Sequence, residues 1–442
     1  MNRAPSILAG LACAALLCTL ATGCLESLRS TEQAEIKAAK AIYAQEDVQT
    51  LRSEPVNRRL QDQLPDELPV EVLWTVPLRD REINVQTLWL PPARVEADLL
   101  VALTTQNDLL TFRRGNGVAR WWTRLGATPM GTPTFSDYSV YTVVNGYLLC
   151  LEITEGEVFW RLRTKFPPSP NMTVNEPERG QPRITMAALN RMVHGLSVME
   201  VLWPPQGGLG KLTREDILLR EKHLRGQWHH PTEGIVEGAV ARAGGYVFVA
   251  DSANQVYCLN PQNLRGSRPR IVWRTTTRGP NTAGVVVEDT YALVASRDRN
   301  LYCYSRINGG DIWRFSAGEI LVEPPVWIRD PATEQAVVLQ RGREGTLFCL
   351  SATTGDQLWT LPGTARVCGL DRDEDRPPAE QTAVVVQLAD GALRALRLRS
   401  GETAWSLPGG ILGPAAAQAH AYAVYATNPN GDQIVALGRV ED

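Results

Sequence analysis

Short apolar strands with one shared pattern of side chains recur along the chain. Five of these segments begin with a Leu that is followed by a Gly eight residues later and by a Trp twelve residues later. They are Leu109–Trp121, Leu148–Trp160, Leu301–Trp313, Leu347–Trp359 and Leu393–Trp405. Val256–Trp273 repeats the pattern with five extra residues in its turn, and Ile434 begins it again without reaching a Trp. Such self-similarity predicts a repeat protein built from short strands.

Each repeat has the features of a β-hairpin. Large and small side chains alternate in the run Leu-Phe-Cys-Leu-Ser at 347–351, so the two faces of the strand meet different neighbours. Thr-Gly, Asn-Gly and Ser-Gly at 354–355, 308–309 and 400–401 supply the positive φ of a tight turn. The Trp falls on the outgoing strand, where its ring can bury area against the next repeat. The blade-docking residues expected from this pattern are Trp121, Trp160, Trp273, Trp313, Trp359 and Trp405.

The spacing of the repeats indicates the architecture. Successive starts at 109, 148, 256, 301, 347, 393 and 434 are 39, 108, 45, 46, 46 and 41 residues apart. A period of roughly 40–50 residues made of short strands is typical of a β-propeller with one repeat per blade. The sequence therefore predicts an all-β fold of four-stranded blades over residues 69–442. A repeat array overrides the usual relation of length to domain number, so we expect one closed propeller.

One interval, of 108 residues, is too long for a single blade. Leu196-Ser-Val-Met-Glu200 fits the repeat loosely, and we expect a degenerate blade there with Trp228 as its Trp. Counting this blade gives eight, whereas seven remain if 167–230 is an excursion from the ring. The stretch from Thr185 to His194 reads as helix or as strand.

An insertion over 203–228 is the longest departure from the period. It begins Trp203-Pro-Pro, and Thr213 can cap a helix over 214–224. That helix would carry three adjacent aliphatic residues. We expect the segment either to plug one face of the propeller or to contact a protein partner, because aromatic and aliphatic anchors carry most interface energy. The candidate partner contacts are Trp203, Ile217, Leu218 and Leu219.

Residues 70–76 alternate like a strand and carry Trp74, a further blade-docking residue. The last repeat, which starts at Ile434, lacks its Trp strand. We therefore expect 70–76 to complete the last blade and close the ring. Closure removes the open sheet edges that favour aggregation.

The pattern at 347–359 resembles the repeat of the PQQ-like (quinoprotein-type) β-propellers, and the resemblance covers most of residues 69–442. Enzymes of that group imply a bound quinone, Ca²⁺ held by oxygen ligands, a catalytic Asp and an adjacent Cys-Cys pair. This chain has no adjacent cysteines and no Cys-x-x-Cys-His haem motif. We therefore expect no cofactor, no metal and no catalytic residue.

Residues 1–23 read as a lipoprotein signal peptide. Arg3 is followed by an apolar stretch from Ile7 to Ala21 that is too short to span a bilayer. The sequence Leu20-Ala-Thr-Gly-Cys24 resembles a bacterial lipoprotein cleavage site, with Cys24 as the lipid attachment. An ordinary secretory signal cut nearby is the alternative. Leu25 in place of Asp implies, by resemblance to enterobacterial lipoproteins, the outer membrane with the propeller facing the periplasm.

Residues 24–68 are expected to form an arm. Ser30 and Gln33 can make a capping box, and the following Ala-, Glu- and Lys-rich stretch predicts a helix from Glu32 to Leu51. A polar tether then leads to Pro69. The arm is interpreted as a spacer, with a partner-binding helix as the alternative.

Charge and polar motifs narrow the function further. A net charge of −3 and the lack of any run of five basic residues argue against nucleic acid as a partner. The adjacent His229 and His230 would point to opposite faces of a strand and chelate a metal poorly. Asp371-Arg-Asp-Glu-Asp375 lacks the Gly of a calcium loop and reads as a charged surface loop.

Four cysteines, Cys150, Cys258, Cys303 and Cys349, occupy the same repeat position on different blades, too far apart for disulfides. We expect each to act as a small buried apolar residue.

Together these features predict a non-catalytic scaffold that binds protein partners in the cell envelope. It would be a monomeric propeller held to the membrane by its lipid anchor alone. Among such lipoproteins the chain is similar to the outer-membrane protein assembly factor B family, which implies a role in outer-membrane protein assembly. Because one propeller fold serves many functions, an envelope sensor or ligand-binding propeller and a PQQ-dependent dehydrogenase remain as alternatives.

Overall fold

The computed structural model describes residues 51, 54–55, 61–62, 64, 70–92, 98–136, 138–164, 166–175, 183–197, 225–372, 377–413, 418–420 and 423–438. In these ranges the regular structure is almost entirely β-strand. The exceptions are a 3₁₀ turn, η2 (Arg79–Arg81), and one short helix, α4 (Pro378–Gln381). No helix among the described residues has the length and apolar character needed to cross a membrane.

Six sheets have four antiparallel strands each. The first three are β3 (Val85–Trp89) to β6 (Ala119–Arg124) through β4 (Leu99–Thr104) and β5 (Asp108–Arg113); β7 (Pro129–Phe135) to β10 (Val158–Arg163) through β8 (Ser139–Val144) and β9 (Tyr147–Glu152); and β11 (Pro168–Asn175) to β14 (Arg225–Pro231) through β12 (Arg183–Ala188) and β13 (Met192–Ser197). The next three are β15 (Ala241–Ala243) to β18 (Arg268–Thr276) through β16 (Tyr246–Ala250) and β17 (Gln255–Arg265); β19 (Val285–Glu288) to β22 (Asp311–Ser316) through β20 (Tyr291–Ala295) and β21 (Asn300–Ser305); and β23 (Val326–Arg329) to β26 (Gln357–Leu361) through β24 (Ala336–Arg341) and β25 (Leu347–Ser351).

A seventh sheet has nine strands in the order β1-β2-β33-β32-β31-β27-β28-β29-β30. Its strands are β1 (Glu54–Pro55), β2 (Glu71–Pro77), β27 (Thr364–Arg372), β28 (Thr382–Leu388), β29 (Leu393–Arg397), β30 (Thr403–Leu407), β31 (Gln418–His420), β32 (Ala423–Thr427) and β33 (Gln433–Gly438). Only one parallel pair, Gly369 with Ala419, joins β27 to β31. Counting this sheet as one blade or as two decides between seven and eight, so the number of blades stays a prediction.

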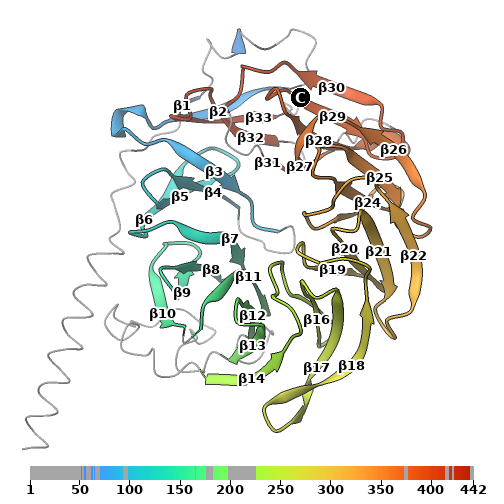
Figure 1. Cartoon of the computed structure of the whole chain (residues 1–442). Coiled ribbons are helices and arrows are strands. Elements are labelled where there is room, and N and C mark those ends of the chain that lie inside the picture. Colours follow the sequence, from blue (N-terminus) through green and yellow to red (C-terminus); the bar gives the residue numbers. More distant parts are fainter. Residues whose placement is uncertain are drawn as a thin grey trace, which may run out of the picture.

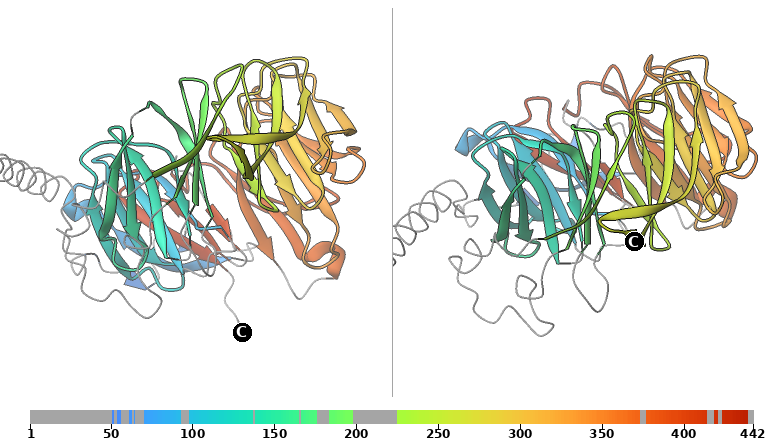
Figure 2. Two further views of the ribbon diagram at one scale, coloured as in Figure 1. Left: turned by 90° about the horizontal axis from the view of Figure 1, so that it is seen from below. Right: turned by 60° about the horizontal axis from the view of Figure 1, so that its bottom comes forward.

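The sheets stand side by side in a ring (Figure 1), and side views show their strands running across the thickness of that ring (Figure 2). The two ends of the described chain meet in one sheet, where β2, in blue, lies beside β33, in red. The antiparallel register runs from Glu71 opposite Gly438 to Pro77 opposite Gln433. The strand expected at 70–76 thus supplies the fourth strand after β31, β32 and β33. The predicted all-β propeller of four-stranded sheets is confirmed.

Burial follows the position of a strand in its sheet. The second strands β4 and β8 are buried along their whole length, because neighbouring sheets cover both of their faces. The outermost strand β22 is exposed or half-buried throughout, because it lies at the rim. Continuous apolar runs therefore mark the inner strands, as expected for strands with two buried faces.

The long interval in the repeat contains a complete four-stranded sheet. β12 and β13 pair from Arg183–Ser197 to Ala188–Met192, so the stretch from Thr185 to His194 is a β-hairpin with its turn at 189–191, and its alternative interpretation as a helix is wrong. Trp228 lies on β14, the outermost strand of this sheet. Residues 198–224 lie outside the described part of the chain.

Part of the N-terminal arm packs on the propeller. The side chains of Leu51 and Leu64 are only 5 % and 7 % exposed and belong to two hydrophobic clusters of the ring. β1 pairs with β2, and Gln61 Oε1 accepts a hydrogen bond from the Val72 amide at 2.8 Å. These residues therefore add to the core as well as linking it to the N-terminus. The signal peptide, Cys24 and the helix expected over 32–51, except for Leu51 itself, lie outside the described residues.

Candidate functional site: the loop face of the propeller

Five of the repeat tryptophans lie against a turn of the neighbouring sheet. Trp121 on β6 packs on Gly156, in the turn between β9 and β10, and its indole Nε1 donates to the Ile153 carbonyl at 2.9 Å. The acceptor lies three residues before the glycine. The same arrangement holds for Trp74 with Arg114, Trp273 with Arg306, Trp313 with Ala352 and Trp359 with Leu398, at 2.8–3.0 Å.

The turn glycines are required by both backbone and packing. Their φ angles lie between +67° and +75°, a region that other residues enter only at a cost. A Cβ at any of them would come within 2.7 Å of an atom of the docked indole ring. Each turn thus serves as the seat for the tryptophan of the preceding sheet. The glycines are Gly117, Gly156, Gly309, Gly355 and Gly401.

Three tryptophans depart from this arrangement. Trp405 donates to Asp371 Oδ2 at 2.8 Å within its own sheet. The ring of Trp228 lies on Gly195 of its own sheet, and the next turn, between β17 and β18, carries the five extra residues. Trp160 is 1 % exposed, and its indole N–H has no acceptor among the described residues. The segment that joins β13 to β14 in the next sheet, 198–224, lies outside the described residues.

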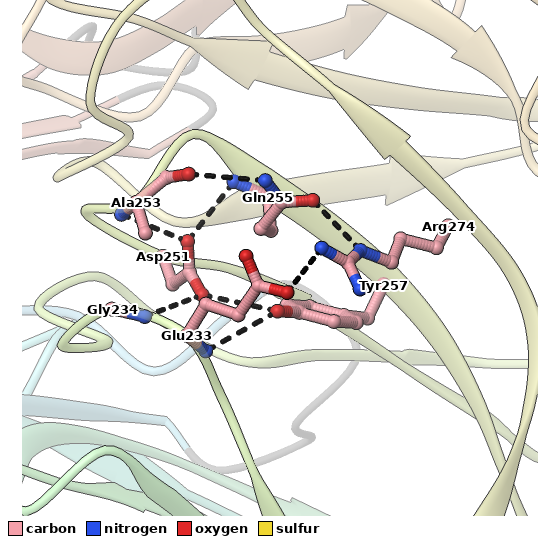
Figure 3. Close-up of polar contacts among 7 residues, drawn as sticks. All are labelled: Glu233, Gly234, Asp251, Ala253, Gln255, Tyr257 and Arg274. Atoms are coloured by element: carbon pink, nitrogen blue, oxygen red, sulfur yellow. Dashed lines mark hydrogen bonds and ion pairs between the residues drawn. The ribbon is translucent and has the colours of Figure 1, made fainter.

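A polar cluster lies where the connection from β14 to β15 meets the turn between β16 and β17 (Figure 3). At its centre is Asp251, which is fully buried. Its Oδ1 accepts from the amides of Ala253 and Gln255, both at 3.0 Å. Its Oδ2 accepts from the Gly234 amide at 2.9 Å and from the Tyr257 hydroxyl at 3.3 Å. We call the seven residues in Figure 3 the Asp251 cluster.

The outer part of the Asp251 cluster holds an arginine from the rim strand. Arg274 on β18 donates through Nε to Gln255 Oε1 at 2.7 Å and forms an ion pair with Glu233. Its guanidinium lies over the Tyr257 ring, 5.5 Å from the centroid. The side chains of Arg274 and Glu233 are 42 % and 52 % exposed, so the ion pair faces solvent. The cluster therefore presents charged side chains to solvent, and beneath them lies the buried carboxylate of Asp251 with its four hydrogen-bond donors.

The next sheet has a similar cluster, in which the central aspartate is Asp298 and occupies a different position in the repeat. Asp298 Oδ2 accepts from the Arg278 amide at 3.0 Å and from the Tyr302 hydroxyl at 2.6 Å, and its Oδ1 accepts from the Asn300 amide at 3.0 Å. In the sheet after that, the buried carboxylate of Glu319 accepts from the Glu344 amide at 2.5 Å. Two kinds of segment form this surface: the connections between successive sheets, and the turns between the second and third strands of each sheet. We call the surface the loop face.

The chemistry of the loop face is that of a rigid polar surface. Burial raises the pKa of Tyr257 to about 12, and burial followed by the hydrogen bond to Asp298 raises the pKa of Tyr302. Both phenols are therefore neutral hydrogen-bond donors at physiological pH. Asp251 has four donors on its two oxygens, which uses the lone-pair sites that a general base would need.

The cysteines and histidines give no reactive constellation in the described part of the chain. Burial raises the pKa of Cys258, Cys303, Cys349 and Cys368 to about 12, so these thiols stay protonated and unreactive at neutral pH. His229 lies beside His194, with ring centroids 6.5 Å apart, whereas His230 meets the Tyr257 ring. No group of three or more His, Cys, Asp or Glu side chains is placed to hold a metal ion within the described ranges.

Two further predictions concern the acidic motif at 371–375 and the insertion at 203–228. Asp371 is 5 % exposed, lies within β27 and accepts from Trp405, so its interpretation as part of a surface loop is wrong. Residues 373–376 lie outside the described residues, as do the candidate partner contacts Trp203, Ile217, Leu218 and Leu219. Sequence reasoning missed the loop face, because the acid at its centre occupies no fixed position in the repeat: Asp251 comes five residues before Val256, whereas Asp298 comes three before Leu301.

Comparison with known proteins gives one family. The model of the family described as outer membrane protein assembly factor BamB matches residues 71–185, 266–408 and 325–439. The chain is similar to the structure of BamB from Moraxella catarrhalis, with 14 % identity, a TM-score of 0.54, and coverage of 84 % of this chain and 97 % of that one. No curated protein sequence matches.

Two further structures share the fold. A computationally designed protein, Ika8, is 13 % identical with a TM-score of 0.56 and coverage of 81 % and 96 % of the two chains. Sqt1 of Saccharomyces cerevisiae is 10 % identical with a TM-score of 0.56 and coverage of 81 % and 97 %. At such identities these structures show the architecture alone.

Proposed function

Because the chain belongs to the outer membrane protein assembly factor BamB family, we propose that it is a protein-binding scaffold of the bacterial cell envelope that serves in outer-membrane protein assembly. Membership also confirms the resemblance to PQQ-like repeats. The observation that carries the proposal is the family match, which extends over both ends of the propeller. The proposal further holds that the protein is monomeric and not an enzyme.

The loop face supports a role in docking. The Asp251 cluster and its counterpart at Asp298 fix their connections by hydrogen bonds to backbone amides, so the surface is preorganised. A preorganised surface loses little conformational entropy when a partner binds. Exposed charged residues lie in the same connections and turns as these carboxylates, and they include Glu233, Arg278 and Arg299. Such a surface suits a protein partner with complementary charge.

Site-specific photo-crosslinking in cells tests the docking proposal. A photoreactive amino acid at Arg299, on the loop face, is expected to crosslink to envelope proteins that mass spectrometry identifies as outer-membrane assembly components. Ile307 is the matched control, because it is 70 % exposed in the turn at the other end of β21 in the same sheet. Crosslinking at neither position, or equally at both, would contradict a docking role for the loop face.

Anchoring through Cys24 is part of the proposal. Cys24→Ser is expected to release the protein into the soluble periplasmic fraction or to leave an uncleaved precursor, since the acyl chains of a lipoprotein supply its membrane affinity. Fractionation of the variant with the outer membrane, as for the parent, would contradict the lipid anchor.

The proposal that the protein is not an enzyme is tested by adding PQQ, the cofactor of the dehydrogenase alternative. The purified protein is incubated with PQQ and Ca²⁺, desalted and examined by absorbance. We expect no retained quinone and no alcohol- or sugar-dependent dye reduction. Stoichiometric retention of PQQ would restore the dehydrogenase alternative.

A further inference from the structure

The hairpin β17–β18 reaches beyond the sheet to which it belongs. β17 has 11 residues and β18 has 9, whereas the corresponding strands β21 and β22 of the next sheet have 6 each. The five additional residues of this repeat lie here, and the hairpin projects from the rim of the ring in Figure 1. Its tip lies against the preceding sheet, where the His229 amide on β14 donates to the Ser267 carbonyl at 2.9 Å.

This hairpin concentrates positive charge in a chain that is negative overall. Between Asp251 and Glu288 the sequence contains no acidic residue, although the net charge of the chain is −3. The segment holds five arginines, and all of them are exposed: Arg265, Arg268, Arg270, Arg274 and Arg278. Arg274 is held by Glu233. Arg265, Arg268 and Arg270 form no ion pair with another described residue, and we call these three the basic tip.

The arrangement of the basic tip is unfavourable without an anion. Arg265 and Arg268 lie directly opposite each other across the hairpin, and like charges in that position destabilise a strand pair. Arg270 follows two residues after Arg268 on the same face of β18, roughly 7 Å further along the strand. The three guanidinium groups therefore repel one another, and a row of carboxylates at the same spacing would relieve the repulsion.

Apolar side chains and a free sheet edge accompany this charge. Leu264, Ile271 and Val272 are 39 %, 40 % and 43 % exposed. β18 is the last strand of its sheet and pairs only with β17. β14 of the preceding sheet touches it at the tip, through the bond from His229 to Ser267, and no strand of the described residues is paired along the rest of its outer edge. Backbone groups at such an edge can hydrogen-bond to an added extended peptide, while alternate side chains set the specificity.

We propose that the hairpin β17–β18 binds an extended, acidic segment of a protein partner, which lies along the edge of β18 with alternate carboxylates facing the basic tip. The edge supplies backbone hydrogen bonds, the arginines select acidic side chains, and the aliphatic residues cover the apolar positions between them. The surface is distinct from the loop face, and the inference does not depend on a role in outer-membrane assembly.

The experiment measures binding of a defined peptide to the purified full-length protein. The probe is a fluorescent ten-residue peptide in which Glu alternates with Val and Thr, and the comparison peptide has Gln in place of Glu. Fluorescence anisotropy is expected to show binding of the acidic peptide that weakens as salt increases. The Gln peptide is expected to bind at least 10-fold more weakly, since an exposed site of this kind draws its selectivity from charge.

A charge-reversal pair assigns the binding to the basic tip. Arg265→Glu/Arg268→Glu/Arg270→Glu is expected to reduce affinity for the acidic peptide at least 10-fold. The matched control reverses three other exposed arginines, Arg81, Arg113 and Arg163. Each set adds three changes of −2, so both variants move the net charge from −3 to −9. The control is expected to change affinity less than about 2-fold, because charges beyond about 10 Å are screened at 0.1 M salt.

Three outcomes would overturn the proposal. The acidic peptide fails to bind the parent protein, or both charge-reversal variants weaken binding equally. Alternatively, the parent binds vesicles of phosphatidylglycerol and phosphatidylethanolamine through the same three arginines and does not bind the peptide, which would make the hairpin a membrane contact. Should the triple variant unfold by circular dichroism, Arg268→Gln replaces it, with an expected loss of about 3-fold.

Discussion

The seating of a tryptophan on a glycine of the next sheet makes one substitution especially informative. In Gly156→Ala the new methyl group would lie 2.5 Å from Cε3 and 2.7 Å from Cγ of Trp121, so the indole must move. Gly146→Ala is the matched control, in the adjacent turn of the same sheet. Its φ is +77°, against +69° for Gly156, but a Cβ there meets nothing within 4 Å. The two variants differ in the contact and share the backbone strain.

The size of the difference can be worked out. A left-handed conformation costs a non-glycine residue about 1–2 kcal/mol, which both variants lose. Overpacking against the indole costs about 1–3 kcal/mol more. Loss of the hydrogen bond from Trp121 to the Ile153 carbonyl adds about 0.5–1.5 kcal/mol. Gly156→Ala is therefore expected to destabilise the protein by about 3–5 kcal/mol and Gly146→Ala by about 1–2 kcal/mol.

Urea unfolding followed by far-UV circular dichroism measures both losses. A second comparison in the Trp121→Ala background removes the ring from the seat. There Gly156→Ala is expected to cost only the strain of about 1–2 kcal/mol, so the double-mutant cycle gives a coupling energy of at least about 1 kcal/mol. Equal destabilisation by the two alanines, or additivity in the cycle, would refute the reasoning.

Three further predictions rest on the same structure. Trp121→Phe is expected to cost about 1 kcal/mol or more beyond Trp160→Phe in urea unfolding, because only Trp121 loses a hydrogen bond and leaves a carbonyl unsatisfied; equal losses would contradict this. Deleting 24–50 is expected to lower the Tm by only a few degrees, whereas deleting 24–77 also removes β2 and should cause aggregation, and matching Tm values would argue against closure by β2. Burial and His229 lower the pKa of His194 to about 4. The unfolded chain then takes up a proton first, so the Tm should fall from pH 6.5 towards pH 4, and less so in His194→Gln.

The repeat itself was readable from the sequence because it is local. A Leu, a Gly and a Trp within thirteen residues describe one hairpin, and that hairpin is the unit that the ring multiplies. The lack of a partner strand after Ile434 likewise pointed to 70–76 as the strand that pairs with β33. Such inferences need only the period-two alternation of a strand and the turn preference of glycine.

The specific contacts needed the tertiary structure. Residue spacing could not show that Gly156 receives Trp121 of the preceding repeat, since that pairing depends on how neighbouring sheets are rotated about the ring. Nor could it show that Asp251 binds the Gly234 amide 17 residues earlier, whereas the next sheet uses Asp298. A buried carboxylate needs donors of suitable geometry, and different positions can provide them, so it leaves no period in the sequence.

One segment stayed ambiguous and another was interpreted wrongly from the sequence for a related reason. The stretch from Thr185 to His194 is a β-hairpin because its two strands, β12 and β13, also pair with β11 and β14, an influence that overrides weak local preferences. Asp371 is buried where Trp405, 34 residues later, donates a hydrogen bond to it. The sequence by itself determined the repeated unit and its number of residues. Only the closed ring decided which side chain of one unit meets the next, because those contacts join residues that are distant along the chain.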